Sequence, residues 1–161
     1  MHIGRKNPNF EYTIIDPDAI SPVIITKTIE ERNLGVIISF DLKHSAQCKT
    51  AASKANKMIG LMKRTFTTRD PSTWKCIYTI YIRPHLEFAS SVWNPYLRSD
   101  IDLLEKVQRA TKIPQSFKYM NYVSRCDKLG LTSLETRRKR GDLIQQFKIY
   151  NKYEKISWYS P

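Results

Sequence analysis

The stretch Ile80–Pro95, IYIRPHLEFASSVWNP, decides how the rest of the chain is interpreted. It is the most apolar and aromatic-rich run in the sequence and contains Tyr81, Phe88 and Trp93. One proline, Pro84, lies inside an otherwise helix-compatible pattern, and the apolar period resumes after it. Because an interior proline removes a backbone donor and bends a helix, the stretch predicts a kinked central helix in a small helical domain.

The segments that precede this stretch have the period of amphipathic helices. Asp70 and Pro71 predict a helix start, with the aspartate as N-cap, and Trp74, Ile77, Tyr78 and Tyr81 would form the apolar side of that helix. Before it, apolar spacings of three and four predict a helix over residues 43–66. Its buried side would consist of Cys48, Ala51, Ala52, Ala55, Ile59, Met62 and Phe66.

Three more helices are predicted after Pro95. Ser99 and Asp102 resemble a capping box, and the helix that follows would bury Leu103, Leu104, Val107 and Ala110 and end at Pro114. A loop and a short helix that ends at Gly130 come next. The capping box Thr132–Glu135 begins the last helix, which runs to about Tyr150 with Leu134, Ile144 and Phe147 inward. Gly141 within it lowers helix propensity by about 1 kcal/mol relative to alanine, which close packing on the kinked helix would explain.

Residues 1–42 differ, with three short β-prone runs at 10–15, 23–25 and 34–40, a turn signal at 16–18, and prolines that exclude a long helix. Such strands need a partner to be stable. The predicted fold class is therefore mainly α, a helical bundle with a small N-terminal β segment. The predicted organisation is a β segment over 1–42, a helical domain over 43–150 and a frayed tail over 151–161.

The charge of the chain is distributed unevenly. The formal net charge is +12, yet residues 1–42 carry four Lys/Arg and six Asp/Glu, so the whole excess lies in residues 43–161. A basic region of this kind favours a polyanion partner, most simply nucleic acid bound through its phosphates, over a merely solvated surface.

The first residues lack the apolar core of a secretory signal, no run is long enough to span a bilayer, and the three dispersed cysteines fit a reducing compartment. We therefore expect an intracellular protein without a membrane span.

Two basic groups are candidate phosphate contacts. The first is a stripe on the 43–66 helix formed by Lys54, Lys57 and Arg64, for which an ordinary solvated face is the simpler interpretation. The second is the run Arg137, Arg138, Lys139 and Arg140, which is a nuclear-localisation patch, a duplex-binding face or a solvated surface. Four consecutive residues surround a helix, so at most some of them can face one ligand, and an arginine can instead pair with Glu105 or Glu87.

Other groups give weak signals for chemistry. The acid pairs Asp16/Asp18 and Asp100/Asp102 are explained by a turn and by a helix N-terminus. The three histidines have no partner at metal-ligand spacing. Cys48 and Cys76 lie on or near apolar helix faces and are expected to be small core residues. The tyrosines and Trp93 could stack on bases, but at helical spacing they are expected to pack in the core.

A series of short motifs follows one another along the chain: Leu34–Val36, Asp41–Lys43, Ala55–Lys57 with Gly60, Arg83–Phe88, Val92–Pro95, Leu104–Lys112, Leu134–Glu135, Arg137–Arg138 and Arg140–Ile144. Taken in this order, they resemble the region that follows the catalytic palm in reverse transcriptases of LINE-type (non-LTR) retrotransposons, the jockey-like elements especially. The resemblance covers residues 30–150 well and residues 1–29 weakly. By this resemblance, residues 1–42 correspond to the last palm strands and residues 43–150 to the helical thumb, which grips the template–primer duplex through its backbone.

The chain departs from the family pattern at important points. It lacks the Tyr-x-Asp-Asp motif and the earlier palm aspartate that hold two Mg²⁺ ions in the family. The family's second basic residue near Arg109 is absent, and Cys126 stands where leucine is common. We therefore expect a non-catalytic fragment with no cofactor of its own, which binds an RNA–DNA hybrid or duplex without sequence preference. The alternative is a decayed or domesticated protein-interaction module with no nucleic-acid role, which self-associates through exposed palm strands.

Overall fold

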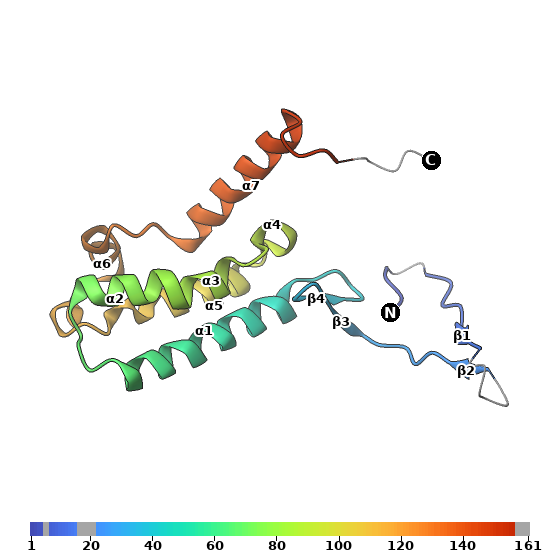
Figure 1. The fold of residues 1–161 in the computed structure, drawn as a ribbon, viewed down its shortest axis with the longest axis horizontal. Coiled ribbons are helices and arrows are strands. Elements are labelled where there is room, and N and C mark those ends of the chain that lie inside the picture. Colours follow the sequence, from blue (N-terminus) through green and yellow to red (C-terminus); the bar gives the residue numbers. More distant parts are fainter. Residues whose placement is uncertain (5–6, 16–21, 157–161) are drawn as a thin grey trace. The chain divides into compact units, whose positions relative to one another are not determined.

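The computed structural model describes residues 1–4, 7–15 and 22–156, apart from the side chains of residues 110 and 111. The predicted turn and candidate acid pair at Asp16 and Asp18 lie outside the described residues. Helices dominate the chain, and two small antiparallel sheets lie near the N-terminus, which confirms the predicted fold class (Figure 1). The chain divides into two compact units, residues 1–47 and 48–161.

The first unit contains two hairpin-like strand pairs. Strands β1 (Thr13–Ile14) and β2 (Val23–Ile24) pair with Thr13 opposite Ile24, and β3 (Glu30–Asn33) and β4 (Val36–Ser39) pair with Asn33 opposite Val36. The predicted strand over 34–40 is therefore shorter at its start, and β3 was not predicted because its sequence, EERN, is entirely polar. Leu34 and Gly35 form the two-residue turn with φ values of +46° and +89°, as hairpin turns of this length require.

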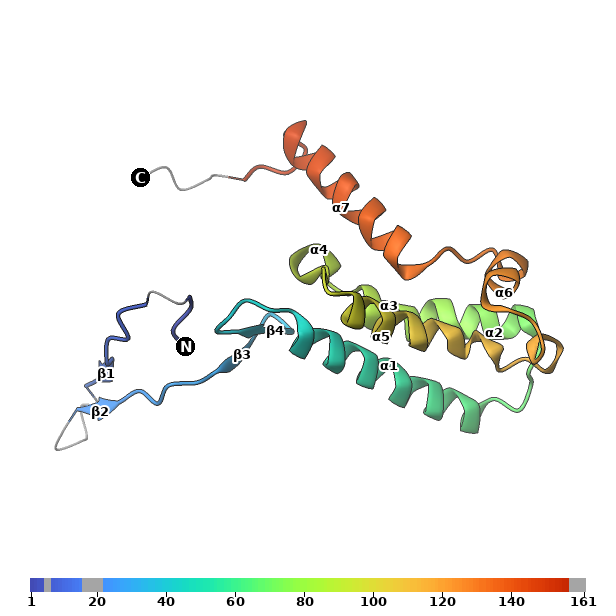
Figure 2. The same ribbon diagram turned by 180° about the vertical axis from the view of Figure 1, so that it is seen from behind.

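Helix α1 (Ser45–Thr65) buries the predicted face. Every residue from Cys48 to Met62 that was expected on that face is buried, whereas Phe66 follows the helix and is 37% exposed. The small side chains of Ala51, Ala52 and Ala55 allow close approach of the neighbouring helices. Figure 2 shows α1 running alongside α2 (Pro71–Ile77) and α5 (Arg98–Gln108).

The central stretch contains a π-helical turn that the sequence analysis did not predict. Helix α2 begins at the expected N-cap, Asp70, whose carboxylate accepts hydrogen bonds from the backbone amides of Ser72 and Thr73 at 3.0 and 3.1 Å. It continues as a π-helix over Tyr78–Ile82 and then as α3 (Arg83–Glu87). The Arg83 amide reaches back to the Tyr78 carbonyl. This wider turn accommodates the proline at position 84, which lacks an N–H and would crowd a regular α-turn.

The extra residue of the π-turn changes which side chains are buried. Ile82 is 1% exposed, whereas Tyr81, predicted to be buried, is 47% exposed. The stretch was also predicted to continue as one kinked helix, but the helix ends at Phe88. Ala89 adopts the left-handed conformation, with φ of +51°, before α4 (Ser90–Trp93) begins. Phe88 is consequently exposed, while Trp93 is completely buried and donates its indole N–H to the Phe88 carbonyl at 2.7 Å.

The predicted helix after Pro95 forms, with a different start. Helix α5 begins at Arg98 with Leu97 at the N-cap, so the capping box expected at Ser99 does not form. Asp102 instead makes an ion pair with Arg98 at 3.1 Å. A 3-10 segment, η2 (Arg109–Lys112), extends α5, and η3 (Gln115–Phe117) follows it. Helix α6 (Tyr122–Leu129) ends at Gly130 in the left-handed conformation, as predicted.

Helix α7 (Leu134–Tyr150) packs through its N-terminal part only. Its N-cap is Ser133, which accepts from the Thr136 amide at 3.1 Å, and the box predicted from Thr132 lies one residue too early. Leu134 is completely buried, but Ile144 and Phe147 are 46% and 60% exposed, against prediction. The described residues of the tail, 151–156, turn back on α7, where the ring of Tyr153 stacks on Phe147 with 6.2 Å between centroids.

Candidate nucleic-acid interface

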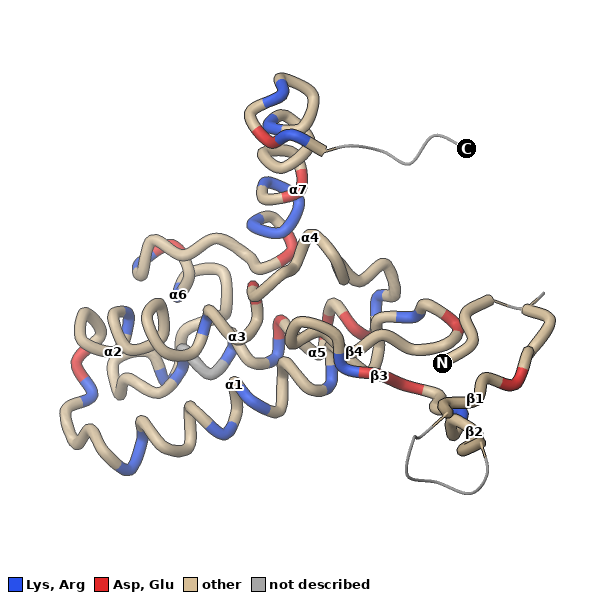
Figure 3. Tube along the Cα trace, turned by 45° about the vertical axis from the view of Figure 1, so that its right-hand side comes forward, with Lys and Arg blue, Asp and Glu red and all other residues tan. Residues whose placement is uncertain are grey.

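The predicted stripe on α1 lies on the exposed side of the helix. Lys54, Lys57 and Arg64 are all exposed, and the buried face of Ala51, Ala55 and Ile59 lies on the other side. Two further exposed basic side chains on α1, Lys49 and Lys63, were not included in the prediction. The signal for them was available, because α1 contains five Lys/Arg and no Asp/Glu (Figure 3).

None of these five side chains makes an ion pair within the described part of the chain. The first turn of α1 contains no acidic residue, and its last turn contains Lys63 and Arg64. The outward face of α1 is therefore a positively charged surface without internal compensation. The predicted stripe from Lys54 to Arg64 spans ten residue steps, about 15 Å at 1.5 Å per residue.

The second candidate group, Arg137 to Arg140, is divided by the helix into different environments. Arg138 is 2% exposed, Arg137 is partly buried, and Lys139 and Arg140 are exposed. Because the guanidinium of Arg138 is inside the protein, it is out of reach of a bound phosphate. Arg138 therefore does not belong to the candidate interface, and the predicted contact at this residue is wrong.

Arg138 is nevertheless unusual for its position. All three of its guanidinium nitrogens are buried, and none has a hydrogen-bond partner among the described residues. Burial lowers the pKa of Arg138, although the carboxylates of Glu105, Glu135 and Glu87 favour its charged form. Because desolvation of a charge whose donors lack hydrogen-bond partners is costly, we expect this side chain to oppose the stability of the fold.

Arg137 is held by a carboxylate from another helix. Its Nε and Nη2 donate to the two oxygens of Glu87 on α3, the second at 3.2 Å, and these bonds raise the pKa of Arg137. Glu87 also forms an ion pair with Arg83 at 3.7 Å. The predicted alternative of a pair with Glu87 is confirmed. Two arginines share one carboxylate here, so the cluster keeps a net positive charge.

The exposed members of the run differ in their pairing. Lys139 donates to Glu135 at 2.9 Å, one turn earlier on α7, and this bond lowers the pKa of Glu135. Arg140 makes no ion pair within the described residues. Of the four residues, Arg140 alone is both exposed and uncompensated.

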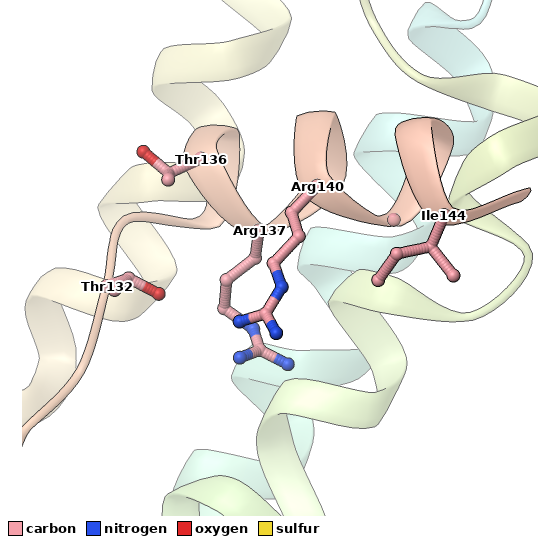
Figure 4. A pocket seen from close by; sticks show the side chains of 6 residues that line it. Thr132, Thr136, Arg137, Arg140 and Ile144 are labelled. Atoms are coloured by element: carbon pink, nitrogen blue, oxygen red, sulfur yellow. The ribbon is translucent and has the colours of Figure 1, made fainter. Parts of the chain in front are cut away.

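A pocket of about 420 Å³ lies beside this part of α7. It is lined by Thr132, Thr136, Arg137, Arg140, Gly141 and Ile144. Figure 4 shows the guanidinium groups of Arg137 and Arg140 side by side and pointing in the same direction. The pocket was not predicted from the sequence, because a run of four basic residues does not show which two of them, here at positions i and i+3, lie on the same side of the helix.

A buried polar network fixes the start of α7. Glu105 accepts from the Tyr122 hydroxyl at 2.8 Å and from the Glu135 backbone amide at 2.9 Å. Gln108 accepts from the Tyr78 hydroxyl and donates to the oxygen of Tyr122, both at 2.9 Å. Burial and then the bond to Glu105 raise the pKa of Tyr122, so its hydroxyl remains protonated. Tyr78 and Trp93 are buried, as predicted, and therefore unavailable for base stacking. The core role predicted for the tyrosines as a group is wrong, because most of the described tyrosines are exposed, namely Tyr12, Tyr81, Tyr96, Tyr119, Tyr150 and Tyr153.

The remaining candidate groups are separated. Asp100 is buried while Asp102 pairs with Arg98, and in the described ranges no three His, Cys, Asp or Glu side chains gather as metal ligands would. Cys48 is buried as predicted, and burial raises the pKa of its thiol to about 12, whereas Cys76 is exposed against prediction. Among the described helices, none combines the length and apolar character needed to cross a bilayer.

Comparison with known proteins gives no relative: no protein-family model, curated protein or solved structure matches the chain.

Proposed function

We propose that this chain is a non-catalytic nucleic-acid-binding region, equivalent to the thumb of a LINE-type reverse transcriptase. The outward face of α1 would bind the phosphate backbone of an RNA–DNA hybrid or duplex without sequence preference. The observation that carries the proposal is the set of five exposed Lys/Arg on α1 with no acid on the same helix. The ordered motif resemblance supports it independently.

The geometry of α1 suits a backbone contact. The roughly 15 Å between Lys54 and Arg64 corresponds to about four phosphates of one strand, at about 3.4 Å of helix axis per phosphate. Lysine and arginine side chains on a rigid helix neutralise phosphates and release counterions, but they do not read bases. The alanine side of α1 is buried, so the basic side chains lie on the side of the helix that faces solvent. Binding by this face would be salt-dependent and independent of sequence.

The test is a titration of the whole chain with an RNA–DNA hybrid at two or more salt concentrations. The triple variant Lys54→Gln, Lys57→Gln and Arg64→Gln should weaken binding, and the slope of log K against log salt should fall by up to about 3, at roughly 0.9 per lost contact. The matched control removes the same charge elsewhere, through Lys118→Gln, Lys128→Gln and Lys155→Gln, all exposed.

The control variant should retain most of the salt slope. An equal loss in both triple variants would mean that net charge alone drives binding, and the α1 interface would be rejected. Absence of binding by the unmodified chain at low salt would remove the proposal altogether.

A second function, self-association as a protein-interaction module, is favoured by one observation. The β1–β2 pair exposes its apolar side chains, with Ile14 57%, Val23 54% and Ile24 60% exposed. Short unprotected strands with apolar side chains are prone to pair with other chains. Light scattering after size-exclusion chromatography tests this function. A dimer that dissociates in the double variant Ile14→Lys and Ile24→Lys would support it, and a monomer at all concentrations would exclude it.

A further inference from the structure

The pocket beside α7 has features that the proposed interface on α1 leaves unused. Two guanidinium groups, those of Arg137 and Arg140, are oriented in parallel at the same pocket (Figure 4). Like charges brought together repel each other, so such an arrangement is stabilised when an anion is present. Glu87 forms ion pairs with Arg137 and Arg83, whereas Arg140 has no ion pair within the described residues.

The chemistry of the lining fits a phosphate group. Guanidinium groups bind phosphate oxygens with paired N–H donors, and threonine hydroxyls add further donors. Thr132 supplies a hydroxyl at the same pocket, whereas the Thr136 hydroxyl is hydrogen-bonded to that of Ser133 at 2.8 Å. The local cluster contains Arg83, Arg137 and Arg140 against the single carboxylate of Glu87, a surplus of two positive charges. A phosphate monoester carries a charge of about −1.5 to −2 at neutral pH and balances that surplus.

The size of the pocket and its glycine indicate more than a bare phosphate. A volume of about 420 Å³ lies in the range of small-molecule sites, about 300–1,000 Å³. Gly141 lines this pocket, and a Cβ added there would meet no atom within 4 Å. The predicted reason for this glycine, close packing on the kinked helix, is therefore wrong. The missing side chain instead leaves room beside the arginines, next to the apolar surface of Ile144.

We propose that this pocket binds the phosphate monoester of a nucleotide, either a free mononucleotide or the 5′-phosphorylated end of a nucleic-acid strand. Arg140 and Arg137 contact the phosphate oxygens, and the sugar and base lie over Gly141 and Ile144. Glu87 positions Arg137 and keeps it extended. The site is independent of the α1 interface, since none of the residues that line it belongs to α1.

The experiment measures binding of adenosine 5′-monophosphate to the whole chain by calorimetry or NMR titration. Arg140→Gln should lower the affinity at least about tenfold, the amount lost with one good charge-assisted contact. The matched control is Lys139→Gln. It removes the same charge from the neighbouring residue, whose side chain does not line the pocket. It should change the affinity less than about twofold, as expected for a screened surface charge. Equal losses in the two variants would overturn the site.

A steric test uses the two helical glycines whose added Cβ would meet nothing. Gly141→Leu should fill the pocket and abolish nucleotide binding, while Gly60→Leu on α1 should leave it unchanged. Both variants should keep or raise the melting temperature, because leucine is the better helix former. Unchanged nucleotide affinity in a folded Gly141→Leu protein would overturn the proposal. If this variant does not fold, the arginine comparison decides.

The source of the phosphate is distinguished with two duplexes of the same sequence. A 5′-phosphorylated duplex that binds more tightly than its 5′-hydroxyl counterpart, with the difference lost in Arg140→Gln, identifies a strand end. Equal binding of both duplexes, together with saturable binding of the mononucleotide, identifies a free nucleotide. Failure of both the mononucleotide and the 5′-phosphate effect rejects the pocket. The triple α1 variant should retain the pocket's mononucleotide affinity, so failure of one proposal leaves the other testable.

Discussion

Helices α1 and α7 have the same number of basic residues, five Lys/Arg each, but they use them differently. On α1 every basic side chain faces outward without an ion pair in the described part of the chain, and the apolar face is buried along most of its length. On α7 one arginine is buried, three basic side chains pair with Glu87, Glu135 and Glu154, and most apolar residues of the C-terminal half are exposed.

The difference shows that basic composition does not define an interface. A helix with a continuous apolar face directs all its charges outward, so α1 presents an extended surface suited to a polymer. A helix that packs only at its start distributes its charges between core, ion pairs and solvent, so α7 presents a local cluster suited to a single group. Substitutions of matched residues in the two helices test this contrast between an extended and a local function.

Matched isoleucines measure how differently the two helices pack. Ile59 on α1 is 6% exposed and Ile144 on α7 is 46% exposed. Ile59→Ala should lower the free energy of unfolding by about 3 kcal/mol, because it removes buried apolar area and leaves a cavity. Ile144→Ala should change it by less than about 1 kcal/mol. Urea unfolding of both variants gives the comparison. Similar losses would show that the C-terminal half of α7 is covered in solution.

The buried arginine of α7 provides the next test. Arg138→Met should raise the free energy of unfolding by about 2 kcal/mol, because it removes a desolvated charge whose donors are unsatisfied and keeps most of the volume. Differential scanning calorimetry at neutral pH measures the change. The reference variant is Arg140→Met, which alters an exposed residue of the same helix and should be close to neutral. Destabilisation by Arg138→Met would indicate that the guanidinium has partners in solution.

The smallest effect concerns acid pH and the start of α7. The bond from Lys139 lowers the pKa of Glu135 below its ordinary value of 4.5. A carboxylate with a lowered folded-state pKa stabilises the fold above its ordinary value, and this stabilisation is lost as the pH falls through the lowered pKa. Glu135→Gln should therefore lose less stability than the unmodified protein as the pH falls below about 4.5. Helix α1 has no carboxylate that could act in this way. Melting temperatures of both proteins measured above and below about pH 4.5 provide the test, and identical pH profiles would contradict it.

Local rules in the sequence identified most of the helices. The N-cap at Asp70, the stop at Gly130 and the buried face of α1 follow from short-range chemistry, because a cap or an amphipathic period acts within a few residues. Prediction failed where tertiary packing set the outcome. Ser133, not Thr132, became the cap of α7, and there the Glu135 amide is bound by Glu105 from α5.

The candidate interface also has one part that could be predicted from local sequence and one part that depends on tertiary packing. The exposed stripe Lys54, Lys57 and Arg64 could be read from the sequence, since the opposite, apolar face of α1 fixes which residues point outward. The environments of the four residues from Arg137 to Arg140 could not, because they depend on where α7 meets α3 and α5. A carboxylate fifty residues away, Glu87, holds Arg137 beside Arg140 at one pocket.

The sequence by itself determined the mainly helical class, the polar and apolar sides of α1, and the concentration of positive charge after residue 42. Only the tertiary structure decided that the proline at position 84 follows a π-turn, that the helix breaks at Ala89, and that Arg138 is buried. The physical reason is the range of the forces involved. Hydrogen-bond capping and helical period act between near neighbours, whereas burial, and with it the availability of a charge, depends on which distant segments pack together.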